Sequence, residues 1–268
     1  MVLIDHHDAV LFDLDGVLYA GPEAVPGAPE ALAELCQRDV PYAFVTNNAS
    51  RSAEQIASHL RTLGIAAKAA EVFSSGPAGV SMMRRELPPP AKVLVTGSAS
   101  LREIVLEAGY ILAHSADEKP QAVIQGFEPT LGWTDLAEAS YAINSGALWF
   151  ATNLDRSVPR ERGMAPANGA LVEAISFSTN TYPMAAGKPE PIMFTQAAHA
   201  LGARHPLVVG DRLDTDVLGG NRAGFATALV LTGATTEAEA QTSTGDLRPN
   251  IIIDTLQDIF TSDHRSQS

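Results

Sequence analysis

Short apolar runs alternate with amphipathic stretches along most of this chain. Residues 10–12, 42–46 and 207–211 form compact apolar runs of the kind found in buried strands. Residues 28–38 and 53–63 instead carry their apolar side chains at helical spacing. Strands that alternate with helices in this way build a parallel sheet with crossover helices. We therefore predict an α/β fold with a Rossmann-like, doubly wound parallel sheet.

The middle of the chain repeats this alternation as a separate series. After three consecutive prolines, the pattern predicts strands at 92–96, 122–125 and 148–152 and helices at 99–108, 135–145 and 169–179. Near residue 185 the pattern returns to the first series. We therefore predict a core domain made of residues 1–77 and 185–268, with a large α/β cap domain inserted at 78–184.

Polar groups follow several of the predicted strands of the core. Asp13 and Asp15 follow the first strand, and Thr46 ends the second. Asp211 ends a later apolar run, and Lys188 stands where the core series resumes. The carboxyl ends of parallel strands lie along one edge of the sheet, where ligands bind in open α/β folds. The sequence therefore predicts that these groups share one site.

Clustered carboxylates at that edge point to a metal ion. Asp13, Asp15 and Asp211 would repel one another and raise each other's pKa if nothing neutralised them. A few oxygen ligands that leave room for water and a phosphate group suit Mg²⁺. Asp216 is a candidate indirect ligand, and the residues around it, 213–223, are expected to form one helix.

The same residue types suit phosphoryl transfer. An aspartate such as Asp13 can attack phosphorus and form an acyl phosphate, and Asp15 is placed to act as the acid and base. Thr46 and Lys188 offer a hydroxyl donor and a positive charge for phosphoryl oxygens, and amides near Asn47 offer further donors. Each segment alone is also typical of an ordinary turn or helix cap, whereas their combination favours an active site.

The composition limits the classes of partner that this protein is expected to bind. The net charge is −13 with only four lysines, which argues against a nucleic-acid or anionic-membrane surface. The single cysteine, Cys36, allows no internal disulfide. The N-terminal residues show no secretory pattern, and no apolar run approaches the length of a membrane span. We therefore expect a cytoplasmic protein that acts on a small molecule.

The chemistry-bearing segments together resemble the haloacid dehalogenase superfamily, and within it subfamily IIA, which includes the NagD-like and p-nitrophenylphosphatase-like enzymes. The resemblance covers essentially the whole chain. It is carried by four segments at residues 13–19, 44–50, 187–189 and 210–216. The detailed similarity is greatest to actinobacterial glycerol-3-phosphate phosphatases.

The resemblance implies a role for each matching residue. It implies Asp13 as the nucleophile and Asp15 as the acid and base, with Thr46 and Lys188 orienting the phosphoryl group. It implies Mg²⁺ held by Asp13, by the backbone carbonyl of Asp15 and by Asp211. An acid at position 15 argues against both a dehalogenase and a transport ATPase of the same superfamily.

The cap is expected to select the substrate. Its loops carry few aromatic side chains and offer Asn153 and Asp155, which suit hydroxyl groups. The core offers Asn47 and Asn48 beside Thr46 as further substrate-binding residues. The segment that joins these cap loops, 157–168, is itself expected to be a loop. Glycerol 3-phosphate is accordingly the single substrate that we predict first. Related pyridoxal phosphatases place a histidine where this chain has Val158, which argues against pyridoxal phosphate as the main substrate.

Several alternatives stay open from the sequence alone. The enzyme could instead hydrolyse a nucleoside monophosphate, phosphoglycolate or pyridoxal phosphate. A phosphomutase is compatible with the same residues, and so is a non-catalytic ligand-binding protein of this fold. The resemblance also leaves open a homodimer formed through the cap.

Overall fold

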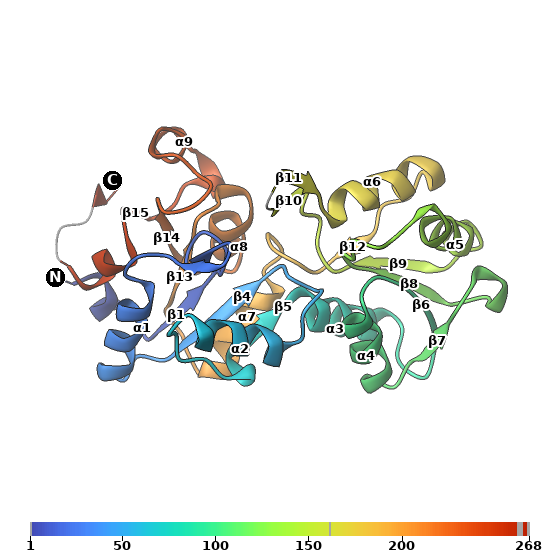
Figure 1. Cartoon of the computed structure of the whole chain (residues 1–268), viewed down its shortest axis with the longest axis horizontal. Helices are drawn as coiled ribbons and strands as arrows, with labels where there is room; N and C mark the ends of the chain where they lie inside the picture. Colours follow the sequence, from blue (N-terminus) through green and yellow to red (C-terminus); the bar gives the residue numbers. More distant parts are fainter. Residues whose placement is uncertain (1, 161, 262–264, 267–268) are drawn as a thin grey trace. The chain divides into compact units, whose positions relative to one another are not determined.

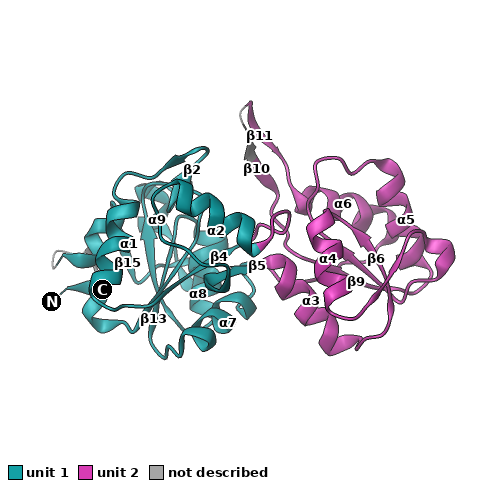
Figure 2. Cartoon of the chain, turned by 60° about the horizontal axis from the view of Figure 1, so that its bottom comes forward, with its two compact units in different colours: residues 1–46, 53–73, 188–268 teal, residues 47–52, 74–187 magenta. Residues whose placement is uncertain are grey.

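The structure is a computed structural model that describes residues 2–160, 162–261 and 265–266. Its chain divides into two compact units (Figure 2). Unit 1 comprises residues 1–46, 53–73 and 188–268, and unit 2 comprises residues 47–52 and 74–187. The short segment 47–52 therefore belongs with the inserted part of the chain, although it directly follows a core strand. The boundaries expected from the sequence lie at 77/78 and 184/185.

Unit 1 is built around one sheet with the strand order β16-β15-β14-β13-β1-β4-β5 (Figure 1). The pairs β1/β13, β1/β4, β13/β14 and β14/β15 are parallel, whereas β16 is antiparallel to β15. The strands are β1 (Ala9–Phe12), β4 (Tyr42–Thr46), β5 (Val72–Ser74), β13 (Pro206–Gly210), β14 (Ala226–Val230), β15 (Ile251–Ile253) and β16 (Arg265–Ser266). This arrangement confirms the predicted fold class.

Helices cover this sheet because their apolar faces match its apolar strands. Helices α1 (Ala28–Gln37) and α2 (Ala53–Thr62) contribute to the same buried cluster as Phe12 and Phe44. Helix α7 (Ile192–Leu201) packs against β1 and β4. Within the described residues, no helix is both long enough and apolar enough to cross a membrane.

Unit 2 contains a second parallel sheet, with the strand order β12-β9-β8-β6-β7. Its strands are β6 (Lys92–Thr96), β7 (Ile111–Ala113), β8 (Ala122–Gln125), β9 (Leu148–Ala151) and β12 (Met184–Ala185). Helices α3 (Ser75–Glu86) and α4 (Ala99–Glu107) share one apolar cluster with this sheet. Helices α5 (Trp133–Asn144) and α6 (Asn168–Thr179) share another. Each sheet therefore has its own core.

Two sequence expectations about local structure were wrong. The segment expected to be a loop contains an antiparallel hairpin of β10 (Ser157–Arg160) and β11 (Gly163–Pro166), whose four-residue strands lack clear alternation of apolar and polar residues. The helix expected over 213–223 is divided into a widened π-helical turn (Leu213–Val217) and a short helix α8 (Leu218–Arg222). Short elements were also missed: β2 (Tyr19–Ala20), β3 (Glu23–Ala24), β7, β12 and α9 (Glu237–Thr242).

Candidate active site

Three of the expected site residues lie at the carboxyl ends of three adjacent strands at the centre of the unit 1 sheet. Strand β1 pairs with β13 on one side and with β4 on the other. The connections that lead to these two neighbours therefore lie on opposite sides of β1. This makes the carboxyl end of β1 a topological switch point, which is the usual ligand site of such sheets. Asp13 follows β1, Asp211 follows β13, and Thr46 is the last residue of β4.

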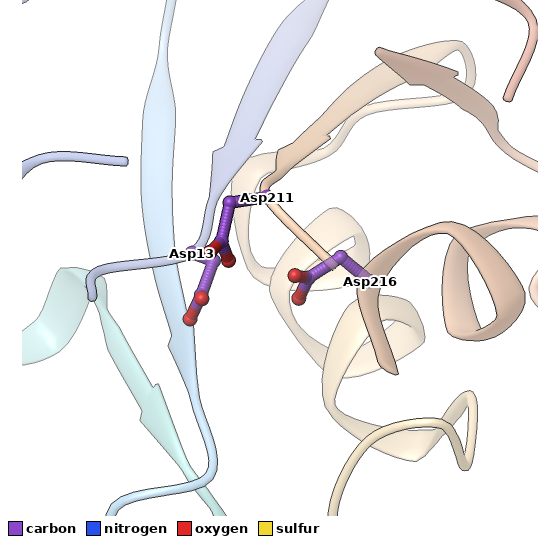
Figure 3. A group of neighbouring side chains, drawn as sticks. All are labelled: Asp13, Asp211 and Asp216. Atoms are coloured by element: carbon purple, nitrogen blue, oxygen red, sulfur yellow. The ribbon is translucent and has the colours of Figure 1, made fainter. Parts of the chain in front are cut away.

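Three carboxylates converge at this switch point (Figure 3). Asp13, Asp211 and Asp216 each offer an oxygen within 4.8 Å of the others, and all three side chains are buried or nearly so. Buried like charges this close repel one another unless a cation or a proton offsets them. The group therefore has the composition and spacing of a cation-binding site.

Lys188 supplies one positive charge to this group from inside the protein. Its Nζ donates hydrogen bonds to Asp13 Oδ1 at 2.6 Å and to Asp216 Oδ1 at 2.7 Å. The same nitrogen donates to the carbonyl oxygen of Val45 at 3.1 Å. The ammonium group is thus held between the acid that ends β1, the π-helical turn and the end of β4. A buried charge held this rigidly is suited to orienting an anionic group.

The pKa of every member of the group departs from its ordinary value. It raises the pKa of Asp13 to about 6, although the Lys188 ammonium opposes the shift. Burial likewise raises the pKa of Asp211 to about 6, with the Asp216 charge adding to it, and raises the pKa of Asp216 to about 6. Burial alone would lower the pKa of Lys188, but Asp13 and Asp216 outweigh it and raise that pKa. The lysine therefore stays charged at neutral pH.

The widened turn explains how Asp216 reaches the site. Val217 N donates to the carbonyl oxygen of Arg212 at 3.1 Å, a bond that spans five residues and opens the turn. Asp216 Oδ2 accepts from Arg212 N at 3.2 Å, while its Oδ1 accepts from Lys188. Both carboxylate oxygens thus bond to protein donors. This fits the indirect role expected for Asp216, which remains a prediction.

Asp211 is held differently. Its Oδ2 accepts a hydrogen bond from Ala234 N at 2.6 Å, whereas its Oδ1 is buried and has no hydrogen-bond partner among the described residues. A buried carboxylate oxygen without a donor is costly unless a ligand completes it. Gly16 approaches the same carboxylate, because a Cβ at that position would lie 2.5 Å from Asp211 Oδ2. Its φ of 81° also favours glycine.

Asp15 lies apart from the buried acidic group. Its side chain is exposed, and its Oδ2 accepts a hydrogen bond from the Tyr19 hydroxyl at 3.3 Å. The following turn is closed by Gly16 N, which donates to the carbonyl oxygen of Tyr19 at 2.8 Å. An exposed carboxyl group can exchange protons with solvent and substrate. The roles expected for its side chain and its carbonyl remain predictions.

Four of the expected binding residues, Asn47, Asn48, Asn153 and Asp155, belong to unit 2. Asn47 Nδ2 donates to Asp155 Oδ1 at 2.8 Å, and Asn153 Nδ2 donates to the carbonyl oxygen of Asn47 at 2.8 Å. Asn48 Oδ1 accepts from the amide of Ser50 at 2.9 Å, which fixes the turn after Asn47. Contact of these side chains with a substrate remains a prediction.

Sequence reasoning missed the segment that follows β14. Ala234 N donates to Asp211, and Thr232 Oγ1 donates to the carbonyl oxygen of Gly16 at 2.7 Å. This segment therefore supports both the metal-ligand candidate and the turn after β1. A detectable signal was present, since Thr232 and Gly233 also follow an apolar strand at the same edge of the sheet.

Comparison with known proteins assigns the family. A family model described as haloacid dehalogenase-like hydrolase matches residues 10–111, and one described as HAD-hydrolase-like matches residues 185–259. The D-glycerol 3-phosphate phosphatase of Mycobacterium tuberculosis is 41% identical over 250 residues, which cover 93% of this chain and 70% of that protein. The acid sugar phosphatase of Staphylococcus saprophyticus is 36% identical over 238 residues, covering 88% and 91% of the two chains.

Similar solved structures point to the same family as these relatives. A crystal structure of the M. tuberculosis glycerol phosphate phosphatase in complex with magnesium superposes with a TM-score of 0.92 at 39% identity, covering 99% of this chain and 79% of that chain. The 4-nitrophenylphosphatase of Thermotoga maritima has a TM-score of 0.89 at 28% identity, covering 97% and 98%. A buried aspartate beside a lysine at a switch point suits phosphoryl transfer. The chain belongs to the haloacid dehalogenase-like hydrolases, as the sequence resemblance predicts, and it is a phosphatase of that family.

Proposed function

We propose that this chain is a Mg²⁺-dependent phosphatase that hydrolyses glycerol 3-phosphate through an aspartyl-phosphate intermediate on Asp13. The observation that carries the proposal is the position of Asp13. It is buried at the end of β1, it is hydrogen-bonded to Lys188 at 2.6 Å, and it shares a cluster with Asp211 and Asp216. With a pKa of about 6, Asp13 is mostly ionised at neutral pH, as a nucleophile must be.

The reaction divides into two displacements at phosphorus. In the first, a carboxylate oxygen of Asp13 forms a bond to phosphorus while the bond to the glycerol oxygen breaks, and Asp15 gives its proton to that oxygen. In the second, a water molecule loses a proton to Asp15 and attacks the same phosphorus, which returns Asp13 as a carboxylate and releases phosphate. Thr46 and Lys188 hold the phosphoryl oxygens, with Asn47 and Asn48 contributing donors beside them.

The residues of the site fit Mg²⁺. Asp211 Oδ1 is buried without a hydrogen-bond partner among the described residues, and the donor set consists of oxygen atoms, which Mg²⁺ prefers. Asp13, Asp211 and the carbonyl of Asp15 would hold the ion, with Asp216 acting indirectly through Lys188 and Arg212. Bound there, Mg²⁺ neutralises charge on the phosphoryl group and fixes its orientation.

The substrate assignment is supported by similarity and by residue chemistry. The M. tuberculosis relative is named for glycerol 3-phosphate. The cap loops expected to face a substrate carry few aromatic side chains that could stack on a base or a pyridine ring. A small polyol phosphate therefore agrees with both. The predicted domain division, the cytoplasmic location and a homodimer through the cap remain predictions.

A comparison of substrates tests the assignment. The specificity constant kcat/KM is measured with Mg²⁺ for glycerol 3-phosphate, phosphoglycolate, pyridoxal phosphate and nucleoside monophosphates. We expect glycerol 3-phosphate to have the highest value. If a nucleotide or pyridoxal phosphate exceeds it tenfold or more, about 1.4 kcal/mol in transition-state binding, the polyol assignment is wrong.

A further inference from the structure

Two phosphate-orienting residues stand at the points where the chain passes between the two units. The chain first leaves unit 1 at the peptide bond between Thr46 and Asn47, and after two intermediate crossings it returns for the last time at the bond between Gly187 and Lys188. Whatever fixes Asn47 and Gly187 within unit 2 therefore also constrains the backbone next to Thr46 and Lys188.

Asn47 is held on both its backbone and its side chain. Its carbonyl oxygen accepts from Asn153 Nδ2 at 2.8 Å and from Ser75 Oγ at 2.7 Å. Its own Nδ2 donates to Asp155 Oδ1 at 2.8 Å. Two of these three partners lie in the segment that follows β9. This segment therefore fixes the first crossing of the chain.

Gly187 is packed against the same segment. An added Cβ there would lie 2.6 Å from both Asn47 Oδ1 and the Thr152 carbonyl oxygen, and 2.7 Å from Asn153 Cβ. Just before it, Ala186 N donates to the carbonyl oxygen of Ala151 at 3.1 Å. The last crossing is thus fixed beside the first, at the carboxyl end of β9.

The polar atoms of Asn153 are used within unit 2. Its side chain is 3% exposed, its Nδ2 bonds to Asn47, and its Oδ1 accepts from Asp155 N at 3.2 Å. Its own carbonyl oxygen accepts from Asn168 Nδ2 at 2.7 Å. A buried amide with both ends bonded has little to offer a substrate, whereas it holds its neighbours firmly.

We propose that Asn153 and Asp155 are positioning residues of the phosphatase site, which hold Asn47 and Gly187 together and thereby set the backbone that presents Thr46 and Lys188. The inference rests on the proposed function. It assigns these two residues a role in orienting the phosphoryl group of every substrate, in place of a contact with the alcohol part of one substrate. A small misplacement of orienting groups costs up to about a hundredfold in rate.

Two substrates separate these roles. Glycerol 3-phosphate and p-nitrophenyl phosphate share the phosphoryl group and differ in everything else. A positioning residue affects kcat for both by the same factor, while a contact with glycerol hydroxyls affects glycerol 3-phosphate alone.

The variants are Asp155→Ala, which removes the acceptor for Asn47, and Asp155→Asn, which keeps an oxygen there. Asp117→Ala, at an exposed position of unit 2, is the matched control, and unfolding midpoints confirm that all variants are folded. We expect Asp155→Ala to lower kcat on both esters by the same roughly ten- to hundredfold factor. We expect Asp155→Asn to restore most of the rate, and Asp117→Ala to match the wild type.

The outcomes are distinct. A loss confined to glycerol 3-phosphate, unchanged rates in Asp155→Ala, or an equal loss that Asp155→Asn does not restore would each overturn the proposal. If the wild type hydrolyses only the nitrophenyl ester, the substrate assignment fails, and the kcat comparison with rescue on that ester still decides the role of Asp155. If the wild type hydrolyses neither ester, the role of Asp155 is decided by titrating each protein with inorganic phosphate in the presence of Mg²⁺. Weaker binding in Asp155→Ala that Asp155→Asn restores supports the role, and equal binding rejects it.

Discussion

The two parallel sheets of this chain end in very different chemistry. At the carboxyl edge of the unit 1 sheet, Asp13, Asp211 and Lys188 bring buried charges together. At the corresponding edge of the unit 2 sheet, Thr96 and Gln125 are buried and uncharged. Both edges have the topology that favours a ligand site. The fold therefore offers a potential ligand site at both edges, and we expect phosphoryl transfer only at the edge that carries the charged residues.

The largest effect should come from removing the nucleophile at the charged edge. Asp13→Asn keeps the shape of the side chain but replaces the carboxylate with an amide, which cannot form the acyl phosphate. We expect kcat to fall more than about 10⁴-fold. Asp214→Asn, which changes an exposed acid near the same site, is the matched control and should retain activity. A near-normal rate in Asp13→Asn would show that the charged edge of the unit 1 sheet does not supply the nucleophile.

Metal removal should have an effect almost as large. Three buried carboxylates beside one ammonium group leave an excess of negative charge that repels a phosphate ester. We expect activity to be lost in a chelator and restored by Mg²⁺, while Ca²⁺ should inhibit because it prefers more ligands and longer bonds. Rates are measured after dialysis against chelator and then during titration with each ion. Full activity in the chelator would contradict the metal assignment.

Removing the buried cation should have a smaller effect. Lys188→Ala deletes the ammonium that bonds to Asp13, Asp216 and the Val45 carbonyl. We expect kcat/KM to fall about 10²–10³-fold, the size of a lost oxyanion-type contact. Lys119→Ala, which removes an exposed lysine, should match the wild type. An unchanged kcat/KM in Lys188→Ala would show that the buried charge serves stability alone.

The smallest effect expected concerns the glycine that approaches Asp211. Gly16→Ala introduces both backbone strain at a φ of 81° and a Cβ 2.5 Å from Asp211 Oδ2. Gly21→Ala is a matched control, because its φ is 61° but no atom lies within 4 Å of the added Cβ. We expect the free energy of unfolding of both variants to fall by up to roughly 3 kcal/mol, because a non-glycine residue at a positive φ is strained. Only Gly16→Ala should require more Mg²⁺ for half-maximal activity, and equal requirements would reject the contact.

Much of the charged edge could be predicted because its signals are local. Each acid directly follows an apolar run, so the end of a parallel strand and the side chain at that end were visible together at Asp13 and Asp211. The comparisons confirm the family, the fold class and the phosphatase activity that these segments indicate.

The remaining features depend on contacts between distant parts of the chain. The bonds from Lys188 to Asp13 and Asp216 join residues 175 and 28 positions apart, and no periodic pattern encodes them. The π-helical turn at Asp216 follows from its bonds with Arg212 and Lys188, so apolar spacing predicted an ordinary helix instead. The hairpin of β10 and β11 lacks the alternation that identifies strands. The hydrogen bonds that link Asn47 to Asn153 and Asp155 likewise could not be predicted from the sequence pattern.

The central claim, that Asp13 carries the phosphoryl group during turnover, can be tested by trapping the intermediate. The wild type and the Asp15→Asn variant are mixed with phosphate-labelled glycerol 3-phosphate and Mg²⁺, quenched in acid, and digested for mass spectrometry. We expect a base-labile phosphate on the peptide that contains Asp13, with more of it in Asp15→Asn if that change slows hydrolysis of the intermediate more than its formation. Turnover with no label on Asp13 in either protein, or label on another residue, would contradict the account.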